Sequence, residues 1–496
     1  MKFKLALFLL VLTVYMLFSS GTPLEGEQQL DVARIVLREG ALSTHSTDVT
    51  FAAYGLKGIN GKFYDCHGIT NVLLMLPVAI LEWVANHFGI ENRKAFSLLG
   101  SLSGAVINSL ACLVFFQILQ EFKRPLKVSL YATLCLAFGT IVFPYASHNY
   151  EGNLNMLLIL GSLYFAFKYN RKRRMVDLFW CSNLAGLAIN SRELSWLFLL
   201  SLALYLLSVT LREKQTKALL WFAGFLAPYI AFWGYYNYIR TGSALLPATI
   251  KVTDSVVGSA ISYDLLTGFS KLLISPGGSI FLYSPVLILG VLGMGRFLKE
   301  ERKDAWPVLS TILLFFVFLA PMKIWFGSWG WGNRYTLEIT PLMALPIAYW
   351  LSPERLKNWA SKGLLIGLLL YGSLLGIAAN ATNWSGRLEY LINLKGWEAF
   401  YFNPMHSQWW DGLRTLAINT WNLRPGSSHP IANPGYANGM SEVSLAASQS
   451  MFSWWNRLLL LGARPGVIVL YLVISFITIV SCLKIVFSYA NKQSQC

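Results

Sequence analysis

Charged side chains of two complementary kinds stand beside apolar segments along this chain of 496 residues. The carboxylates are Glu25, Glu27, Asp31 and Glu151, and the cationic or protonatable side chains are Lys57, His67, Arg93, Arg192, Arg240 and Arg334. An ionised carboxylate can take the proton of a nucleophile as a bond forms. Arginine and lysine bind phosphate, and the guanidinium fork matches a phosphate bidentately. Brought together, the two groups predict proton abstraction next to a phosphate-bearing substrate.

The composition decides what kind of chain must position these residues. Hydrophobic residues make up 55% of it, aromatic residues 15% and charged residues only 13%, which is too little charge to cover a soluble protein of this length. The sequence therefore predicts an all-α polytopic membrane protein. The formal charge of +16 comes from short basic clusters between apolar segments, as in cytoplasmic loops, so we expect no nucleic-acid partner. The six cysteines stand at neither disulfide nor zinc spacing.

Apolar stretches of spanning length divide the chain. Met1 to Ser20 carries Lys2 and Lys4 before an apolar run without a clear cleavage site, so we expect a retained first helix rather than a signal peptide. Further spans are predicted at 96–120, 128–147, 153–169, 175–191, 194–210, 218–238, 279–298, 305–322, 336–352, 361–379 and 466–488. With the first helix, these form a bundle of about twelve transmembrane helices.

The stretch GKFYDCHGITNVLLMLPVAILEW, residues 61–83, holds an apolar run that we do not count as a span. From Ile69 to Leu81 it offers about thirteen residues with Pro77 inside, and runs of that length are more often interfacial, re-entrant or buried. If it crossed, the basic segments EFKRPLK, YNRKRR and LREKQTK would face outward, against the preference of Lys and Arg for the cytoplasm. We therefore expect it along the outer leaflet, with Asp65 and His67 held at its mouth.

This topology makes both termini cytoplasmic and turns four polar stretches outward, namely 21–95, 148–152, 239–278 and 380–465. We divide the chain into a transmembrane domain (1–379), an extracytoplasmic loop region (380–465), and a last transmembrane helix with a cytoplasmic tail (466–496). The carboxylates and cations named above all fall on outward helix ends or loops, and charges that converge there indicate a site. We expect the protein in the plasma or inner membrane, with an extracytoplasmic site.

Residues 23–40 are predicted to form an amphipathic helix whose buried side carries Leu30, Ala33, Ile35, Val36 and Leu37. Such a helix lies in the membrane interface and holds its acidic residues near the head groups. A structural interpretation stays open, because Glu25 and Glu27 would favour a helix N-terminus through its dipole alone. Likewise, Arg192 and Arg240 would suit contacts with ordinary lipid phosphates.

The stretch WFGSWGWGNRYTLEITP, residues 325–341, alternates tryptophans with small residues just before Arg334. Glycines let the backbone approach a ligand closely, and aromatic faces give a sugar a surface on which to pack. An interfacial aromatic belt would explain the tryptophans but not the glycines. We therefore predict sugar contacts at Trp329 and Trp331, and also at Tyr64 near His67.

Several motifs in order resemble bacterial members of the GT-C glycosyltransferase superfamily. They are the acidic amphipathic helix, GKFYDCHGI, FPYASHNYEGN, LAGLAINSRELSW, YNYIRTGS, LLISPGGSIFLYSPVLIL and WFGSWGWGNRY. That superfamily comprises integral membrane enzymes related to the dolichyl-phosphate-mannose protein mannosyltransferases and to the aminoarabinose transferase that modifies lipid A. The resemblance covers roughly residues 1–350, and the shared order of the motifs is more specific than any one of them.

The resemblance implies transfer of a sugar from a polyprenyl-phosphate donor to an acceptor hydroxyl outside the cytoplasm, with inversion at the anomeric carbon. A first-loop carboxylate would be the general base. Glu25 stands where the family usually has the aspartate of an Asp-Glu pair, and because Gly26 follows it, Glu27 or Asp31 is a further candidate. Glu151 matches an acidic residue of the second outer loop. Arg334 matches an arginine that in relatives more often follows a proline than an asparagine.

The six cationic candidates would serve the donor phosphate, and some of them must be structural because one phosphate cannot use them all. The implied partners are the polyprenyl-phosphate sugar, an extracytoplasmic glycan, lipid or protein acceptor, and membrane lipid. No cofactor is firmly implied, no metal ligands are assigned, and the need for a divalent metal is left open.

Two other functions fit parts of the sequence. A ligase or polymerase of the O-antigen type has about a dozen spans and would use the late outer loop, with Arg387, Arg414, Arg424 and His429 as its site. A lipid-linked-sugar flippase or other secondary transporter would also be polytopic. The long first loop and the lack of an evident inverted repeat disfavour a transporter.

Overall fold

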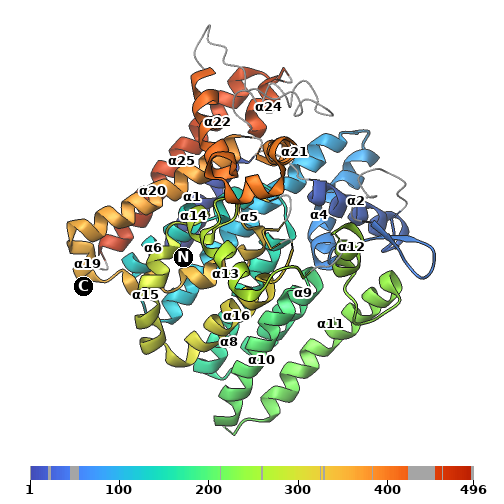
Figure 1. Ribbon diagram of the computed structural model, residues 1–496, viewed down its shortest axis with the longest axis horizontal. Helices are drawn as coiled ribbons and strands as arrows, with labels where there is room; N and C mark the ends of the chain where they lie inside the picture. The colour runs from blue at the N-terminus through green and yellow to red at the C-terminus, as the bar shows by residue number, and fades with distance from the viewer. Residues whose placement is uncertain are drawn as a thin grey trace.

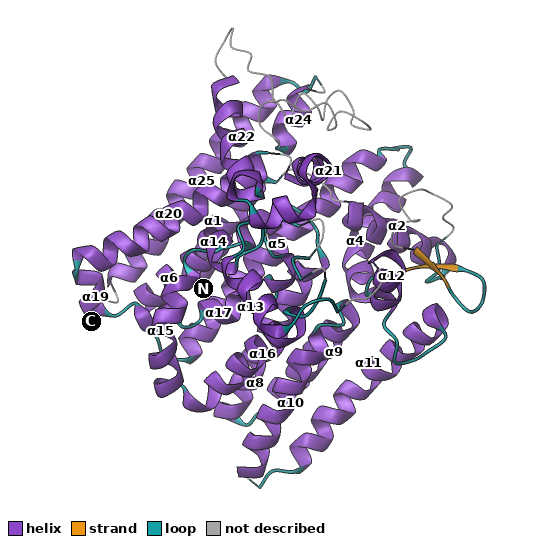
Figure 2. Ribbon diagram, viewed as in Figure 1, coloured by secondary structure: helices purple, strands orange, loops and turns teal. Residues whose placement is uncertain are grey.

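The computed structural model describes residues 2–19, 24–44, 55–212, 214–257, 261–323, 325–327, 330–382, 384–422, 453–460 and 462–492. These residues form an all-α membrane protein with one small antiparallel hairpin, β1 (Gly55–Lys57) and β2 (Phe63–Asp65), drawn in orange in Figure 2. The predicted fold class is thus confirmed.

Most predicted spans correspond to helices. The longer helices among the described residues are α1 (Lys2–Phe18), α2 (Leu24–Glu39), α4 (Ile69–His87), α5 (Arg93–Glu121), α8 (Glu151–Lys172), α9 (Met175–Ser191), α10 (Ser195–Arg212), α11 (Lys217–Thr241), α16 (Arg302–Leu319), α20 (Trp359–Ala381), α21 (Trp384–Phe402), α22 (Gln408–Asn422) and α25 (Pro465–Lys492). By length and composition, six of the described helices could cross a membrane, namely α4, α5, α10, α11, α20 and α25. The total of about twelve spans therefore stays a prediction.

Three predicted spans are interrupted rather than continuous. They contain α6 (Leu126–Gly139) with α7 (Val142–Ala146), α14 (Ile280–Tyr283) with α15 (Leu287–Glu300), and α17 (Thr340–Ala344) with α18 (Ile347–Trp350). Pro285 and Pro346 stand at the second and third interruptions, where proline removes a backbone donor and crowds the preceding turn. The remaining short elements are α12 (Ala248–Val257), α13 (Leu265–Ile274), α19 (Pro353–Lys357), α24 (Trp454–Leu460), and the 3-10 turns η1 (Arg334–Thr336) and η2 (Pro404–His406).

The first helix is an integral part of the bundle. Its residues Leu7 and Val11 are buried in the main hydrophobic core, and the Tyr15 hydroxyl donates to the carbonyl of Ala137 at 2.8 Å. At its C-terminal end, the indole nitrogens of Trp454 and Trp455 donate to backbone carbonyls of the last turn, each at 2.9 Å. These bonds satisfy carbonyls that have no partner inside the helix.

Loops that are predicted to be cytoplasmic contact one another. Arg171 Nη2 lies 2.6 Å from Asp304 Oδ2, and Lys172 Nζ lies 3.8 Å from Glu121 Oε1. The C-terminal ends of α5 and α8 and the start of α16 are therefore at the same end of the bundle.

The start of α4 lies at the opposite end. The backbone N–H of Gly68, just before α4, donates to Glu151 Oε1 at 3.2 Å. Glu151 is the first residue of α8, and the last residue of that helix is Lys172, which pairs with Glu121 at the other end of the bundle.

The other end of α4 also lies away from the ion pairs of Arg171 and Lys172. Glu82 Oε2 accepts from Arg34 Nε at 2.6 Å, and Arg34 shares the carboxylate of Asp31 with Arg93. Arg93 begins α5, and Glu121 ends it. Both ends of α4 are thus linked to residues near the starts of α8 and α5. Because α4 is also long and apolar enough to cross a membrane, its not crossing stays a prediction, and so does its place along the outer leaflet.

The arrangement in space agrees with these contacts. In Figure 1, α21, α22 and α24 lie at the top and α2, α4 and α12 at the right, whereas α19 lies at the left and the turn between α10 and α11 at the bottom. Elements from the predicted outer stretches therefore gather away from the predicted cytoplasmic turns.

Candidate active site

The loop between β2 and α4 carries a buried carboxylate and imidazole. Asp65 and His67 are 2% and 8% exposed, and His67 Nδ1 lies 2.7 Å from Asp65 Oδ1, which also accepts the His67 backbone N–H at 3.1 Å. Burial lowers the pKa of His67, but the charge of Asp65 and its hydrogen bond outweigh burial and raise that pKa well above its ordinary value. Burial likewise raises the pKa of Asp65, and His67 more than compensates, so that it is lowered. Both shifts favour the charged forms, an imidazolium beside a carboxylate.

Arg240 fixes the path of this loop. Its Nη1 donates to the carbonyls of Asp65, Cys66 and His67, each at 3.0 Å, and its Nη2 donates to Asn237 Oδ1 at 2.8 Å. The guanidinium also stacks on the ring of Tyr236, 3.9 Å from its centroid. A phosphate role was predicted for Arg240, but these donors are directed at the protein itself.

Glu151 stands against the same loop. It is 5% exposed, accepts from the backbone N–H of Gly68, and its charge acts on both His67 and Arg192. As the first residue of α8, it also lies at the positive end of a helix dipole. Glu151 and His67, predicted from separate motifs, are therefore brought together.

Arg192 forms a buried ion pair with a carboxylate that the sequence reasoning missed. Its Nη1 lies 2.5 Å from Glu338 Oε1, and Glu338 also accepts from Asn155 Nδ2 at 2.8 Å. The guanidinium lies 4.6 Å from the centroid of the Tyr335 ring. The sequence does hold a signal for this pair. Glu338 is an ionisable residue inside the predicted span 336–352, and such a residue needs a partner within the membrane.

The Trp-Gly stretch folds back closely on itself. Gly327 and Gly332 have φ angles of 87° and 59°, a region that favours glycine. A Cβ added at Gly327 would lie 2.7 Å from the Cβ of Arg334, and one at Gly332 would lie 2.6 Å from the ring of Tyr283. Close packing and backbone conformation therefore explain glycine at these two positions. From the sequence alone, the glycines had instead been attributed to close approach of a ligand.

An aromatic cluster surrounds Arg334. Its guanidinium carbon lies 5.3 Å from the centroid of the Tyr150 ring, and the Trp384 ring is 6.4 Å from that ring and 5.7 Å from the ring of His148. Arg334 is partly exposed, and its charge also acts on Arg192. The guanidiniums of Arg192 and Arg334, from different parts of the chain, thus lie near each other, and Arg192 also feels the charge of Glu151.

The predicted sugar-binding aromatics are buried. Trp331 is 1% exposed and packs edge-on against Tyr283, with ring centroids 5.6 Å apart. Tyr64 is 4% exposed, and its hydroxyl accepts from Asn60 Nδ2 at 2.7 Å. Both pack within the fold rather than present an open face, while Trp329 lies outside the described residues.

The first-loop carboxylates divide into different environments. Helix α2 packs through Leu30 and Ala33 against a cluster that includes Tyr64 and Ile69, so the predicted amphipathic helix is present beside the loop of His67. Asp31 is engaged by two arginines, as described for α4.

The other predicted residues of the first outer stretch lie nearer the surface. Glu27 is exposed on α2, and Lys57 is exposed on β1. Glu25 belongs to α2, but its side chain lies outside the described part. Arg93 is directed at Asp31, with its Nη2 2.8 Å from Asp31 Oδ1.

Metal ligation at this site has one candidate set among the described residues. Ligand atoms of Asp65, Cys66 and His67 lie within 4.8 Å of one another. A protonated imidazole does not bind a metal, so the ion pair of Asp65 and His67 competes with such a role. Burial raises the pKa of the Cys66 thiol, and His67 offsets only part of that rise. The raised pKa disfavours a thiolate ligand.

The fold and this cluster define a polytopic helical membrane protein with buried ion pairs at one end of its bundle. A sequence model of the family described as dolichyl-phosphate-mannose-protein mannosyltransferase matches residues 70–235, about a third of the chain. The predicted resemblance to GT-C membrane glycosyltransferases is thereby confirmed. No curated protein matches the chain.

Solved structures with similar arrangements are membrane glycosyltransferases. ArnT from Cupriavidus metallidurans bound to undecaprenyl phosphate has 14% identity and a TM-score of 0.48, covering 79% of this chain and 68% of that one. The Archaeoglobus fulgidus oligosaccharyltransferase, in complex with Zn and sulfate, has 14% identity and a TM-score of 0.47, covering 82% and 58%. The arabinosyltransferase EmbB from Mycobacterium smegmatis has 12% identity and a TM-score of 0.44, covering 98% and 40%. Similarity at this level transfers neither a substrate nor a residue role.

Proposed function

We propose that this protein transfers a sugar from a polyprenyl-phosphate donor to an acceptor hydroxyl on the extracytoplasmic side, with inversion at the anomeric carbon. The observation that carries the proposal is the convergence of His67, Glu151, Arg192 and Arg334 from four separate segments at one end of the bundle. The family described by the matching sequence model acts with a lipid-phosphate sugar donor, as its name states.

The donor phosphate would bind between the imidazolium of His67 and the guanidinium of Arg334. The bond from the anomeric carbon to the phosphate oxygen breaks, and the leaving phosphate gains negative charge. Cations fixed in a buried site stabilise this charge more in the transition state than in the ground state. The ion pair of Arg192 and Glu338 would keep the segment of Arg334 in position, and Glu151 would keep the loop of His67 against α8.

The acceptor hydroxyl would lose its proton to a carboxylate of α2. A positioned base contributes on the order of a hundredfold or more. We propose Glu25 or Glu27 for this role, since the Asp31 carboxylate is already bound by Arg34 and Arg93. Inversion follows if the hydroxyl attacks from the face opposite the phosphate.

Purified protein in lipid nanodiscs with radiolabelled polyprenyl-phosphate sugars and candidate acceptors tests the proposal. The assay is run with EDTA and with added Mg²⁺, which decides whether a divalent metal is needed. We expect label in a new glycosidic bond and its loss in Arg334→Ala. Label that enters sealed vesicles without a new glycosidic bond would instead establish a transporter.

The ligase-type alternative receives less support. Arg387, one of its proposed residues, is 7% exposed and its Nε donates to Asp411 Oδ2 at 2.8 Å, which is an intraloop contact between α21 and α22. Arg414 is exposed on α22, and Arg424 and His429 lie outside the described residues. Changing Arg414 should therefore leave transfer unchanged.

A further inference from the structure

Three apolar side chains are exposed where the hairpin of β1 and β2 meets the end of α11. Ile59 in the hairpin turn is 55% exposed, Phe63 at the start of β2 is 43% exposed, and Leu245 in the turn between α11 and α12 is 81% exposed. We call these three residues the hairpin patch. Figure 2 shows the hairpin in orange at the right edge of the molecule, beside the upper end of α11 and next to α12. Apolar side chains exposed on neighbouring turns indicate a surface that contacts a membrane or another molecule.

The hairpin is fixed to the end of α11. The Ile59 backbone N–H donates to the carbonyl of Ile239 at 3.1 Å, and a Cβ added at Gly58 would lie 2.5 Å from the same oxygen. A Cβ added at Gly242, the residue that follows α11, would lie 3.4 Å from the Ile59 side chain. Ile59 therefore lies level with the last turn of α11.

Helix α11 sets the depth of the hairpin patch in the membrane. It is one of the described helices that are long and apolar enough to cross a membrane. Tyr235 and Tyr238 are exposed near its C-terminal end, and tyrosine marks the boundary between hydrocarbon and head groups. Lys217 begins the helix, so in the predicted topology its C-terminal end is the extracytoplasmic one. The hairpin patch then lies at the level of the outer head groups.

Strand pairing directs one face of the hairpin away from the protein. Leu56 and Tyr64 form a cross-strand pair and are buried in the cluster that also contains residues of α2 and α4. Lys57 and Phe63 form the next pair, and because side chains alternate along a strand, this pair lies on the opposite face. That face carries both an aromatic ring and an ammonium group.

Three exposed lysines accompany the hairpin patch. Lys57 and Lys62 are on the hairpin and Lys251 is on α12, with its Nζ 3.4 Å from the last carbonyl of α11. Neither 55–63 nor 241–252 contains an aspartate or a glutamate. An apolar surface with only positive charges around it is complementary to anionic head groups above an acyl layer.

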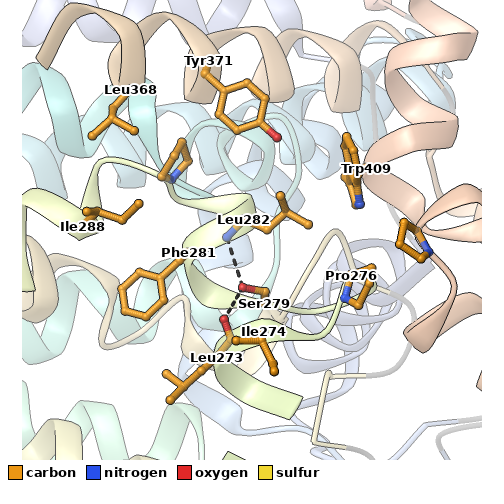
Figure 3. A pocket seen from close by; sticks show the side chains of 12 residues that line it. Leu273, Ile274, Pro276, Ser279, Phe281, Leu282, Ile288, Leu368, Tyr371 and Trp409 are labelled. Atoms are coloured by element: carbon orange, nitrogen blue, oxygen red, sulfur yellow. Dashed lines mark hydrogen bonds between the residues drawn. The ribbon is translucent and has the colours of Figure 1, made fainter. Parts of the chain in front are cut away.

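Charge distinguishes this surface from the open apolar groove between α14, α20 and the start of α22 (Figure 3). Leu282, Ile288 and Leu368 are among the residues that line the groove, and none of its lining residues is charged. A phosphate there would have no cation to compensate it, which is costly in an apolar environment. At the hairpin patch, by contrast, the lysines supply that compensation.

We propose that the hairpin patch docks onto anionic phospholipid of the outer leaflet. Its three apolar side chains enter the upper acyl region, and the three lysines contact head-group phosphates. Lys57, for which the sequence predicted a donor-phosphate role, is thereby assigned to membrane lipid. Strand β2 ends at Asp65, the partner of His67, so one strand connects the lipid surface to the loop of His67. The docking does not depend on the proposed transferase activity and is measured without it.

Fluorescence quenching in nanodiscs tests the depth of the hairpin patch. A fluorophore is attached at Ile59→Cys or Leu245→Cys, and the quencher is a nitroxide on the acyl chain of phosphatidylglycerol or phosphatidylcholine, placed near the head group or near the chain end. The native cysteines of the described part are buried, so the parent treated with the same reagent gives the background. Phe476→Cys on the lipid-exposed α25 is the hydrocarbon reference, and Thr420→Cys, exposed on α22, is the aqueous reference.

We expect both patch positions to be quenched by the nitroxide near the head group and less by the one near the chain end. Quenching at Leu245→Cys should be stronger with phosphatidylglycerol than with phosphatidylcholine. Lys57→Gln/Lys62→Gln should reduce this preference by about fivefold for each lysine removed, and high salt should reduce it as well. The matched control is Lys123→Gln/Lys214→Gln, which removes two exposed lysines from turns at the other end of the bundle and should keep the preference.

Three results would overturn the proposal. They are quenching at the patch positions no greater than at Thr420→Cys, as for a surface in water or covered by a protein partner; equal quenching by the two lipids in the parent; and an equal loss of preference in both lysine double variants. Size-exclusion profiles confirm that each variant is folded.

Discussion

Arg192 Nη1 lies 2.5 Å from Glu338 Oε1, and the two side chains are 10% and 0% exposed. Arg192 follows α9 and Glu338 follows η1, so this pair ties the segment after Arg334 to the C-terminal end of α9. A charge buried this deeply is tolerated because it is paired.

Arg192→Leu should destabilise the protein strongly, because it leaves the Glu338 carboxylate buried with only Asn155 as partner. Breaking one side of a buried pair typically costs about 3–5 kcal/mol. The double variant Arg192→Leu/Glu338→Leu should recover most of this loss, since no uncompensated charge remains. Thermal unfolding in detergent measures both.

Arg414→Leu is the control for that experiment, since it removes an exposed arginine from α22. Equal instability of the single and double variants would contradict a pairing role for Arg192. If the double variant is stable yet inactive, Arg192 acts on the substrate as well.

The ion pair of Asp65 and His67 predicts a pH dependence. Burial lowers and Asp65 raises the pKa of His67, with a net rise, so the imidazolium persists above about pH 6.5, the ordinary value for histidine. The stability from this shift is present below that value and is lost as the pH rises through the raised pKa. The pKa of Asp65 is lowered, so its contribution is present above about pH 4 and is lost on acidification.

Activity should therefore fall on the alkaline side as His67 loses its proton. Asp65→Asn should move that limb of the kcat/KM profile to lower pH, and His67→Gln should remove it. An unchanged alkaline limb in Asp65→Asn would show that a different group titrates.

Close backbone approach at Gly68 gives a steric prediction. A Cβ there would lie 2.2 Å from the carbonyl oxygen of Ser191, so Gly68→Ala must displace the loop of His67 from α9 and from Glu151. We expect lower kcat and a lower midpoint of thermal unfolding. Gly224→Ala in α11 is the matched control, since nothing lies within 4 Å of its added Cβ. Equal activity of both variants would argue against a fixed loop.

Local features of the sequence predicted much of the fold. Helices such as α8 and α11 end within a few residues of the predicted bounds, because spanning length and basic turns mark them. The breaks before α15 and α18 were not predicted although Pro285 and Pro346 stand there, because the apolar runs 279–298 and 336–352 continue through both prolines. The contacts of Arg240 with three carbonyls could not be predicted, because the partners are 173 to 175 positions away. Site residues on one loop were thus found more readily than their long-range partners.

The carboxylates of α2 are assigned two different roles, a structural one for Asp31 and that of the general base for Glu25 or Glu27. Asp31 Oδ1 accepts from Arg93 at 2.8 Å and from Arg34, and Arg34 also binds Glu82, so Asp31→Asn should loosen the packing of α2 on α4 and α5.

We expect Asp31→Asn to lower the midpoint of thermal unfolding and to leave kcat within a fewfold of the parent. Glu25→Gln or Glu27→Gln should instead lower kcat by on the order of a hundredfold, with little effect on unfolding, because the base acts only as the acceptor proton leaves. Single-turnover rates with a labelled polyprenyl-phosphate sugar separate the chemical step from product release. If both glutamine variants retain the parent rate while Asp31→Asn loses it at unchanged stability, the base is Asp31, and its two arginines must then release it when the acceptor binds.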